Sequence, residues 1–402
     1  MANTLAVSTI VERAMAVLHQ KATFLNKVNR QYESKFFEKG VTKTGATGYV
    51  KVPVPAVIRD GRVMQVQDQV ETTRPVSINK YKGVDTGATS LEMSLDIDRY
   101  QEEFIDNKIP GLIAAVEADC LATCVPLVYD AAGDYGLFND VSTVLAAGAI
   151  LDNNLAPIDD RYMLTNTAAS AQVVNSLTGF YNPNGTIGNQ FKTGNMAENT
   201  LGFDWYKTTL MPTLTRGSAN TAYETATGGA NLGADGMSID IDTGAGTWAV
   251  GDIFTIQGVN AVHPETKADL GYLKQFVCST ANAAGGTMTL YFTPAIVVSG
   301  PLQNVTNTPG ADKDVLPLGT ASTAYQQNIA FSRDAFYIVT ADLPEPKGMG
   351  VQVATAVHEG IALRFMRGFD MVNDVWLSRF DIAYGAGVLR PELAVRIPNI
   401  PA

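Results

Sequence analysis

One change of composition along the 402-residue chain constrains its fold more than any other feature. Residues 213–325 hold 15 of the 36 glycines and carry short runs of alternating apolar and polar residues with little helical periodicity. Glycine- and asparagine-rich turns separate these runs, which is typical of a small all-β sandwich or barrel. A pattern of helices and strands precedes residue 213 and resumes at about residue 326. We therefore predict an all-β barrel inserted into an α+β domain, an arrangement that neighbouring termini make tolerable.

Length and composition fit a globular protein of several domains. A chain of this length exceeds what one compact core usually serves, and 46% apolar against 17% charged residues excludes a disordered or fibrous protein. The net charge of −11 argues against tight binding of nucleic acid over the whole surface. No apolar run approaches the roughly 18 residues of a membrane-spanning helix, and the first residues do not resemble a secretory signal. We therefore expect a chain that is made in the cytoplasm and binds no membrane.

The only basic stretch is the N-terminal arm, residues 1–43, in which seven Lys and Arg face three Asp and Glu. Apolar residues recur at helical spacing over residues 4–30. Lys21, Lys27 and Arg30 add positive charge towards the end of this helix, where its dipole favours cations. Two interpretations stay open: an amphipathic helix on the protein's own core, or an arm that lies on a neighbouring subunit or an acidic partner.

The next segment, residues 48–97, alternates between apolar and polar side chains and predicts a long β-hairpin with a further strand. Its alternating runs are residues 50–54, 74–82 and 91–97. The sequence Arg59-Asp60-Gly61-Arg62 between the first two runs predicts a turn. Prolines within these runs favour exposed or edge strands. Because a two-stranded ribbon is marginal in water, this hairpin needs another surface to lie against.

A helix is expected to begin at Pro110 and to end or kink at Pro126. Cys120 and Cys124 share one face of it, and two thiols without further ligands predict burial as small apolar residues rather than zinc binding. With Cys278 they make three cysteines, too few for a disulfide framework and consistent with a reducing compartment. Helical and extended patterns alternate over the remaining α+β segments.

No motif indicates an enzyme. The three histidines form no metal-binding pair, and neither a nucleophile elbow nor a phosphate-binding loop occurs. Asp240 and Asp242 have the spacing of a metal pair, but they alternate with Ile239 and Ile241, which predicts the solvent face of a strand. We therefore expect no catalytic residue, no cofactor and no metal site.

The order of these segments resembles the major capsid (coat) proteins of tailed bacteriophages with the Hong Kong 97-type fold. More narrowly, the chain is similar to the podovirus P-22-like coat family, which carries an inserted β-domain. The stretches that carry the resemblance are residues 151–163 (LDNNLAPIDDRYM), 202–212 (beginning GFD), 250–259 (VGDIFTIQGV), 273–277 (LKQFV), 330–344 (AFSRDAFYIVTADLP) and 379–392 (RFDIAYGAGVLRPE). Their order makes the resemblance specific, whereas the first 150 residues are similar in layout.

The resemblance implies a division of the chain into known parts. These are an N-terminal arm (1–43), an extended hairpin loop with the following strand (44–97), the spine-helix part of a peripheral domain (98–130), central-domain and peripheral-domain parts (131–212 and 326–402), and the inserted β-barrel (213–325). Candidate intersubunit contacts are Arg59, Asp60 and Arg62 at the hairpin turn, and candidate inward-facing residues of the arm are Lys21, Lys27 and Arg30.

The resemblance also implies a function. A major capsid protein assembles with itself into hexamers and pentamers of an icosahedral shell, the capsid of the virion, around double-stranded DNA. The implied partners are other copies of the chain, a scaffolding protein, a portal, and the packaged DNA through weak non-specific contact. Two alternatives stay open: a hydrolase or glycan-processing enzyme with a β binding module, and another self-assembling component of the virion or its tail.

Overall fold

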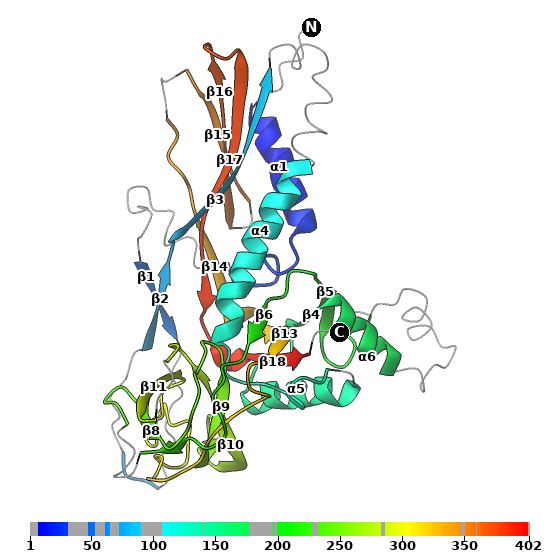
Figure 1. Ribbon diagram of the computed structural model, residues 1–402. Coiled ribbons are helices and arrows are strands. Elements are labelled where there is room, and N and C mark those ends of the chain that lie inside the picture. Colours follow the sequence, from blue (N-terminus) through cyan, green and yellow to red (C-terminus); the bar gives the residue numbers. More distant parts are fainter. Residues whose placement is uncertain are drawn as a thin grey trace. The chain divides into compact units, whose positions relative to one another are not determined.

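A computed structural model describes residues 7–30, 47–52, 61–64, 72–89, 107–138, 140–176, 196, 199–226, 232–282, 286–346, 350–358 and 360–400 (Figure 1). The chain divides into two compact units. The first unit comprises residues 1–50, 73–121 and 336–387, and the second comprises residues 51–72, 122–335 and 388–402. Both units are assembled from segments far apart in the sequence, so neither can form until distant parts of the chain have met.

The first unit is built on a long antiparallel sheet. Its strands are β3 (Lys80–Thr89), β14 (Phe336–Ala341), β15 (Gln352–His358), β16 (Ile361–Asp370) and β17 (Val375–Val388). They are ordered β14-β17-β16-β15, and β3 also pairs with β17. The pairing of β3 with β17 runs over ten positions, from Lys80 opposite Tyr384 to Thr89 opposite Val375.

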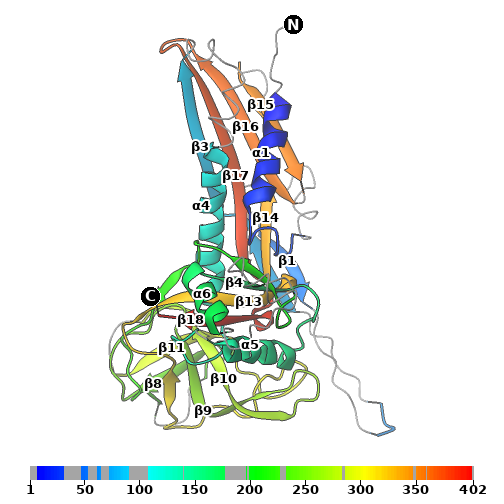
Figure 2. The same ribbon diagram turned by 90° about the vertical axis from the view of Figure 1, so that its right-hand side faces the viewer.

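Two helices lie along one face of this sheet, α1 (Val7–Lys21) and α4 (Asn107–Cys124) (Figures 1 and 2). The helical periodicity predicted over residues 4–30 ends at Lys21. The reason is local, because the Asn26 side-chain amide donates to the carbonyl oxygens of His19 and Ala22, both at 2.7 Å, and so satisfies acceptors at the helix end. The chain then forms a bridge between Asn29 and Tyr337.

Helix α4 is a buried core helix. Together with the following turn η3 (Val125–Leu127) it is long and apolar enough to cross a membrane by length and composition, so the expectation that no segment would reach this threshold was wrong. More than half of it is buried, however, and a core helix passes the same test. Cys120 and Cys124 are fully buried in it, as predicted, and it ends just before Pro126.

The predicted hairpin differs from the structure in one respect. Strands β1 (Thr47–Val52) and β2 (Thr72–Ser77) pair as a two-stranded sheet. The second run, residues 74–82, is however not one strand: β2 ends at Ser77, Ile78 is buried, and β3 pairs with β17 instead of β1. The third run, residues 91–97, lies outside the described residues.

The second unit contains a five-stranded sheet and the helices that accompany it. Its strands are β4 (Arg161–Thr165), β5 (Asp204–Lys207), β6 (Thr213–Thr215), β13 (Ala324–Ser332) and β18 (Ala394–Asn399), and its helices are α5 (Val141–Asn153) and α6 (Thr167–Ser176). The strand order is β18-β13-β4-β5, with β6 also pairing with β13. Strands β4 and β5 are parallel, and β13 is antiparallel to its neighbours. Two short 3₁₀ turns, η5 (Arg333–Ala335) and η6 (Pro391–Leu393), join the remaining elements.

A six-stranded sheet between the two halves of this unit nearly closes into a barrel. Its strands are β7 (Glu224–Thr225), β8 (Ser238–Asp242), β9 (Ile253–Val262), β10 (Asp269–Cys278), β11 (Met288–Thr293) and β12 (Val315–Pro317), ordered β12-β9-β10-β11-β8-β7. The two outer strands meet through a bridge between Glu224 and Asp314 and a hydrogen bond from the Val315 amide to the Tyr223 carbonyl of 2.8 Å. The prediction of a β-barrel within an α+β protein is therefore confirmed.

Candidate assembly surface

Among the described residues, helices cover one face of the first unit's sheet, and none lies on the other, helix-free face. Along β3, exposed and half-buried residues alternate strictly through most of the strand. Lys80 and Lys82 point towards α4: the ammonium group of Lys80 lies 2.8 Å from an Asp119 carboxylate oxygen, and that of Lys82 donates to the carbonyl of Ala115 at 2.7 Å. Tyr81 and Asp85 are exposed on the opposite face. The period of two along a strand produces this division.

Asp119 holds the covered side together. Besides Lys80, it accepts a hydrogen bond of 2.7 Å from the hydroxyl group of Tyr384 on β17. Burial alone would raise the pKa of Asp119, but the bonds from Lys80 and Tyr384 outweigh it and lower that pKa. The same contact, added to burial, raises the pKa of Tyr384. One carboxylate therefore joins α4 to two neighbouring strands.

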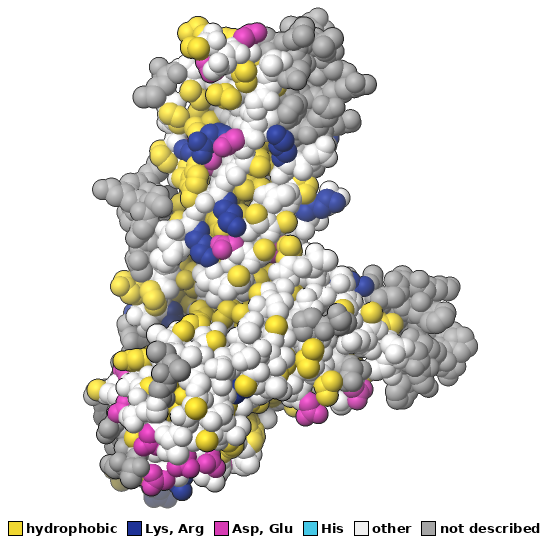
Figure 3. Space-filling model, in the orientation of Figure 1, with side chains coloured by type: hydrophobic (Ala, Val, Ile, Leu, Met, Phe, Trp, Pro, Cys, Tyr) yellow, Lys and Arg dark blue, Asp and Glu magenta, His cyan; other side chains and the backbone are white. Residues whose placement is uncertain are grey.

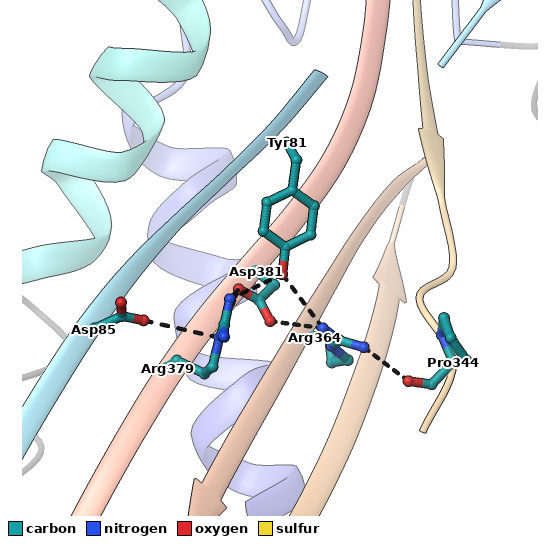
Figure 4. A network of polar contacts seen from close by, with 6 residues as sticks. All are labelled: Tyr81, Asp85, Pro344, Arg364, Arg379 and Asp381. Atoms are coloured by element: carbon teal, nitrogen blue, oxygen red, sulfur yellow. Dashed lines mark hydrogen bonds and ion pairs between the residues drawn. The ribbon is translucent and has the colours of Figure 1, made fainter. Parts of the chain in front are cut away.

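The helix-free face is organised around a buried carboxylate, Asp381 on β17 (Figure 4). An Arg364 nitrogen donates to one of its oxygens at 2.8 Å, and two Arg379 nitrogens donate to the other at 2.7 and 3.0 Å. Burial alone would raise the pKa of Asp381, but these bonds and one from Tyr81 lower it. The carboxylate therefore stays ionised, because charge-assisted bonds of this kind are strong.

Gly83 makes room for this carboxylate. It lies on β3 directly opposite Asp381 in the strand register. A Cβ atom at this position would approach an Asp381 carboxylate oxygen and the Phe380 carbonyl oxygen, each to 2.8 Å. Only glycine therefore allows β3 to pair here without displacing the charged cluster.

The cluster continues from its buried centre to an exposed rim. Tyr81 accepts a hydrogen bond of 3.0 Å from Arg379, which also lies 3.8 Å from the exposed carboxylate of Asp85. The bond to Asp381 raises the pKa of the Arg379 guanidinium group. On the other side, Arg364 donates to the Pro344 carbonyl at 2.8 Å. The network therefore joins β3, β17 and β16 to the segment after β14, and leaves charged groups on the helix-free face.

The structure describes four of the six candidate residues that the sequence analysis named. Arg62 lies in the exposed turn of residues 61–64, whereas Arg59 and Asp60 lie outside the described residues. Of the arm residues, Lys21 is exposed at the end of α1, and Lys27 and Arg30 are half-buried in the segment that follows.

Sequence reasoning missed the residues of the charged network. The signal available was a charged residue inside an apolar run, as in Ile361-Ala-Leu-Arg364-Phe and Phe380-Asp381-Ile382. Such a charge within a strand indicates a paired buried group, because an unpaired one is too costly. The sequence does not state which distant charge completes the pair.

The segment after α1 is attached to the helix α4 through Glu117. This buried carboxylate accepts hydrogen bonds from the backbone N–H groups of Thr23, at 3.0 Å, and Phe24. Burial raises the pKa of Glu117, and the backbone bonds, including one from Leu25, only partly oppose this shift. The segment that follows α1 is thereby fixed to α4 by a group whose ionised form is costly to bury.

This contact gives a pH-dependent prediction. A carboxyl whose pKa is raised on folding stabilises the protein less as the pH rises through its folded pKa, since the buried group must then ionise. In Glu117→Gln the acceptor oxygen remains and the titration is lost. The free energy of unfolding of the natural chain should therefore fall relative to that of the variant as the pH rises from about 4.5. Urea unfolding of the free subunit between pH 4 and pH 8 measures it, and a difference independent of pH would contradict this role of Glu117.

The described residues hold no group of three or more His, Cys, Asp or Glu side chains arranged to bind a metal ion. Asp240 and Asp242 lie half-buried on β8 and alternate with fully buried Ile239 and Ile241, as the sequence predicted. The polar contacts described above join strands and helices of the first unit to one another.

Comparison with protein families identifies the class. The family model described as "P22 coat protein - gene protein 5" matches residues 114–398, which is more than two thirds of the chain. The fold is therefore the Hong Kong 97-type capsid fold, and the protein is the major capsid protein of a tailed phage, which forms the icosahedral shell of the virion. The chain belongs to the P22 coat protein family. This family is structural, so the enzyme and tail-component alternatives are wrong.

Solved structures show more distant similarity. A structure from Mycobacterium phage Che8 matches with a TM-score of 0.46 and 12% identity, covering 94% of this chain and 90% of that one. The capsid structure of the cyanophage P-SCSP1u and the mature capsid of bacteriophage PhiM1 each match with a TM-score of 0.41 and 10% identity, covering 90% of this chain and 85% of theirs. A comparison with curated proteins found no match.

Proposed function

We propose that copies of this chain join in the shell through the hairpin of β1 and β2, which lies within the predicted loop of residues 44–97. The observation that supports this is the pairing of β1 and β2, which form a sheet of only two strands within the described residues. Such a ribbon is marginal by itself in water. Its turn, residues 61–64, exposes Val63 and Met64 by 78% and 77% beside Arg62. An arm of this kind gains stability when it lies on a neighbouring subunit, and Arg59, Asp60 and Arg62 are its proposed contact residues.

The turn can be tested by substitution. Val63→Ser combined with Met64→Ser should leave the unfolding midpoint of the free subunit unchanged, because both side chains are exposed. Shell assembly should need about tenfold more subunit, since apolar anchors carry more binding energy than exposed ions. Arg62→Glu should have a smaller effect in the same assay. Sedimentation and electron microscopy of the assembly reaction measure both, and assembly at the natural concentration by the double variant would refute the contact.

We further propose that the shell subunits form hexamers and pentamers and that the arm of residues 1–43 faces inward. The support is its net charge of +4 in a chain of net charge −11. Lys21, Lys27 and Arg30 would then meet a scaffolding protein before the DNA enters and the packaged double-stranded DNA afterwards, weakly and without sequence preference. A portal would complete the shell. No membrane takes part.

Charge reversal tests the direction of the arm. Replacing Lys21, Lys27 and Arg30 together by Glu should reduce the yield of DNA-filled particles and the incorporation of scaffolding protein at low salt. The reason is that the arm would then carry negative charge and would repel the negatively charged partners that it is proposed to attract. The matched control reverses Lys207, an exposed lysine on β5 outside the arm. Unchanged assembly and packaging by the triple variant would count against an inward arm.

We also propose that the chain is divided into the parts of the capsid fold. These are the arm (1–43), the hairpin loop with its following strand (44–97), the spine-helix part (98–130), the central and peripheral parts (131–212 and 326–402) and the inserted β-barrel (213–325). The support is that the barrel strands β7 to β12 all lie within this range, and that β4 and β5, which precede it in the chain, belong to one central sheet with β18, which follows it. Separate proteolytic release of residues 213–325 would test this boundary.

A further inference from the structure

The inserted barrel meets the central sheet around a buried arginine, Arg396 on β18. The side chain is completely buried, and its Nη2 atom donates to the carbonyl of Gly251, just before β9, at 2.8 Å. Its Nε and Nη1 atoms are also buried, and they have no hydrogen-bond partner among the described residues. A guanidinium group only donates, so these N–H groups need an acceptor, and a buried donor without one costs free energy.

A second arginine lies in the same surroundings. Arg216 directly follows β6 and is 6% exposed. Its Nη2 atom donates to the Ala219 carbonyl at 2.7 Å, and its buried Nε atom has no partner in the described part of the chain. Burial lowers the pKa of both guanidinium groups, and Asp252 and Tyr135 oppose this change at both of them. The two positive charges therefore share one buried environment.

One carboxylate stands against these two charges. It belongs to Asp252, which is buried and accepts from two backbone N–H groups at 2.9 and 3.1 Å. The described residues place no carboxylate oxygen within 4.0 Å of a nitrogen of either arginine. Asp130, whose carbonyl accepts from the Arg396 backbone N–H, has its carboxylate 3.8 Å from the ammonium group of Lys274. One positive charge is therefore left uncompensated, and burying such a charge is costly.

We propose that Arg396 and Arg216 bind one small monovalent anion, of the class of chloride and bromide, at this junction. Such an ion accepts from several N–H donors at once and cancels the remaining positive charge. A water molecule would leave that charge uncompensated and would need acceptors for its own protons, which guanidinium groups do not have. A divalent anion would exceed the single charge to be balanced.

The ion is enclosed when the barrel and the central sheet come together. Asp and Glu side chains gather on the face of the barrel seen in Figure 3, and a surface of this sign repels anions. Arg396 itself is completely buried, so its guanidinium group does not reach the solvent. The test is therefore made on subunits refolded from urea in the chosen salt, so that the ion is present while the site forms.

The urea midpoint of the free subunit measures the binding. Sodium chloride or bromide replaces sodium gluconate, whose anion is much larger, at constant ionic strength. An ion that binds only the folded chain and is present at about ten times its Kd should lower the unfolding equilibrium constant about tenfold. Arg216→Gln removes one charge and leaves Arg396 balanced by Asp252, so this variant should lose most of that response.

The matched control is Arg161→Gln. Arg161 is equally buried in the same unit, at 7% exposed, but its side chain is paired: it lies 2.8 Å from an Asp152 carboxylate oxygen and donates to the carbonyls of Pro157 and Ala156, both at 2.7 Å. This variant should keep the halide response of the natural chain. Equal responses of the natural chain and Arg216→Gln would indicate a general salt effect and would overturn the proposal.

A second measurement does not depend on whether a variant folds. Crystals of the natural subunit refolded in bromide should give an anomalous scattering peak within about 3.5 Å of Nε or Nη1 of Arg396, the hydrogen-bond distance lengthened for a large anion. Bromide peaks on the surface alone would show an adventitious ion only. That result, or a peak-free junction, would overturn the proposal and leave the shell function untouched.

Discussion

Replacing Asp381 by Ala should destabilise the free subunit by about 3–5 kcal/mol, because removing one partner of a buried ion pair leaves the other partner uncompensated. Asp381 is completely buried, and the side chain of Arg364 that faces it is only 12% exposed. The variant would leave Arg364 without its carboxylate and would also remove the acceptor of the Arg379 bonds. Three strands meet at this residue, so the loss should loosen the sheet as a whole.

Urea unfolding of the purified subunit, followed by circular dichroism, measures the effect. Asp85→Ala is the matched control: its carboxylate contacts Arg379 at 3.8 Å but is 80% exposed, and exposed pairs contribute little. Asp381→Asn separates shape from charge, since it keeps the volume and removes the charge. If Asp381→Ala unfolds at the same urea concentration as Asp85→Ala, the buried network does not stabilise this sheet.

Acid should weaken the same network. A carboxyl whose pKa is lowered on folding contributes stability above its unfolded pKa, and this contribution is lost as the pH falls through its folded pKa. The lowered pKa of Asp381 therefore places the loss below about pH 4.

Local periodicity explains why much of the fold could be predicted. The alternation of buried Ile239 and Ile241 with Asp240 and Asp242 is visible in the sequence and holds in β8. This pattern depends on neighbours two residues apart along one strand, so a single chain contains all the information needed.

Pairing between distant segments could not be predicted in this way. Residues 80–82 continue the alternation of β2, yet they form part of β3 and pair with β17, about 300 positions further along the chain. Gly83 is understandable only when Asp381 lies opposite it. The helix end at Lys21 likewise depends on the Asn26 side chain reaching back to two carbonyls. Tertiary contacts decide each of these features, and one sequence without relatives does not reveal them.

Truncating Phe254 to Ala in the inserted barrel should cost about 3–5 kcal/mol, the usual range for removing a buried aromatic side chain. Phe254 is fully buried, and its ring lies 5.4 Å from that of Trp248, 5.8 Å from that of Phe276 and 5.7 Å from that of Phe292. Its strand, β9, pairs with both β10 and β12. A cavity here would therefore separate the rings on which the closed sheet packs.

The fluorescence of Trp248 should report this loss, because that ring contacts Phe254 directly. Leu316→Ala on β12 is the control: Leu316 is partly exposed and should lose much less stability. Because a shell requires many folded subunits at once, a loss of this size should also reduce the yield of shells at 37 °C more than the yield of soluble subunits. Normal shell yield together with an unchanged unfolding midpoint would show that the barrel tolerates the cavity, and the aromatic cluster would then not be what holds the barrel closed.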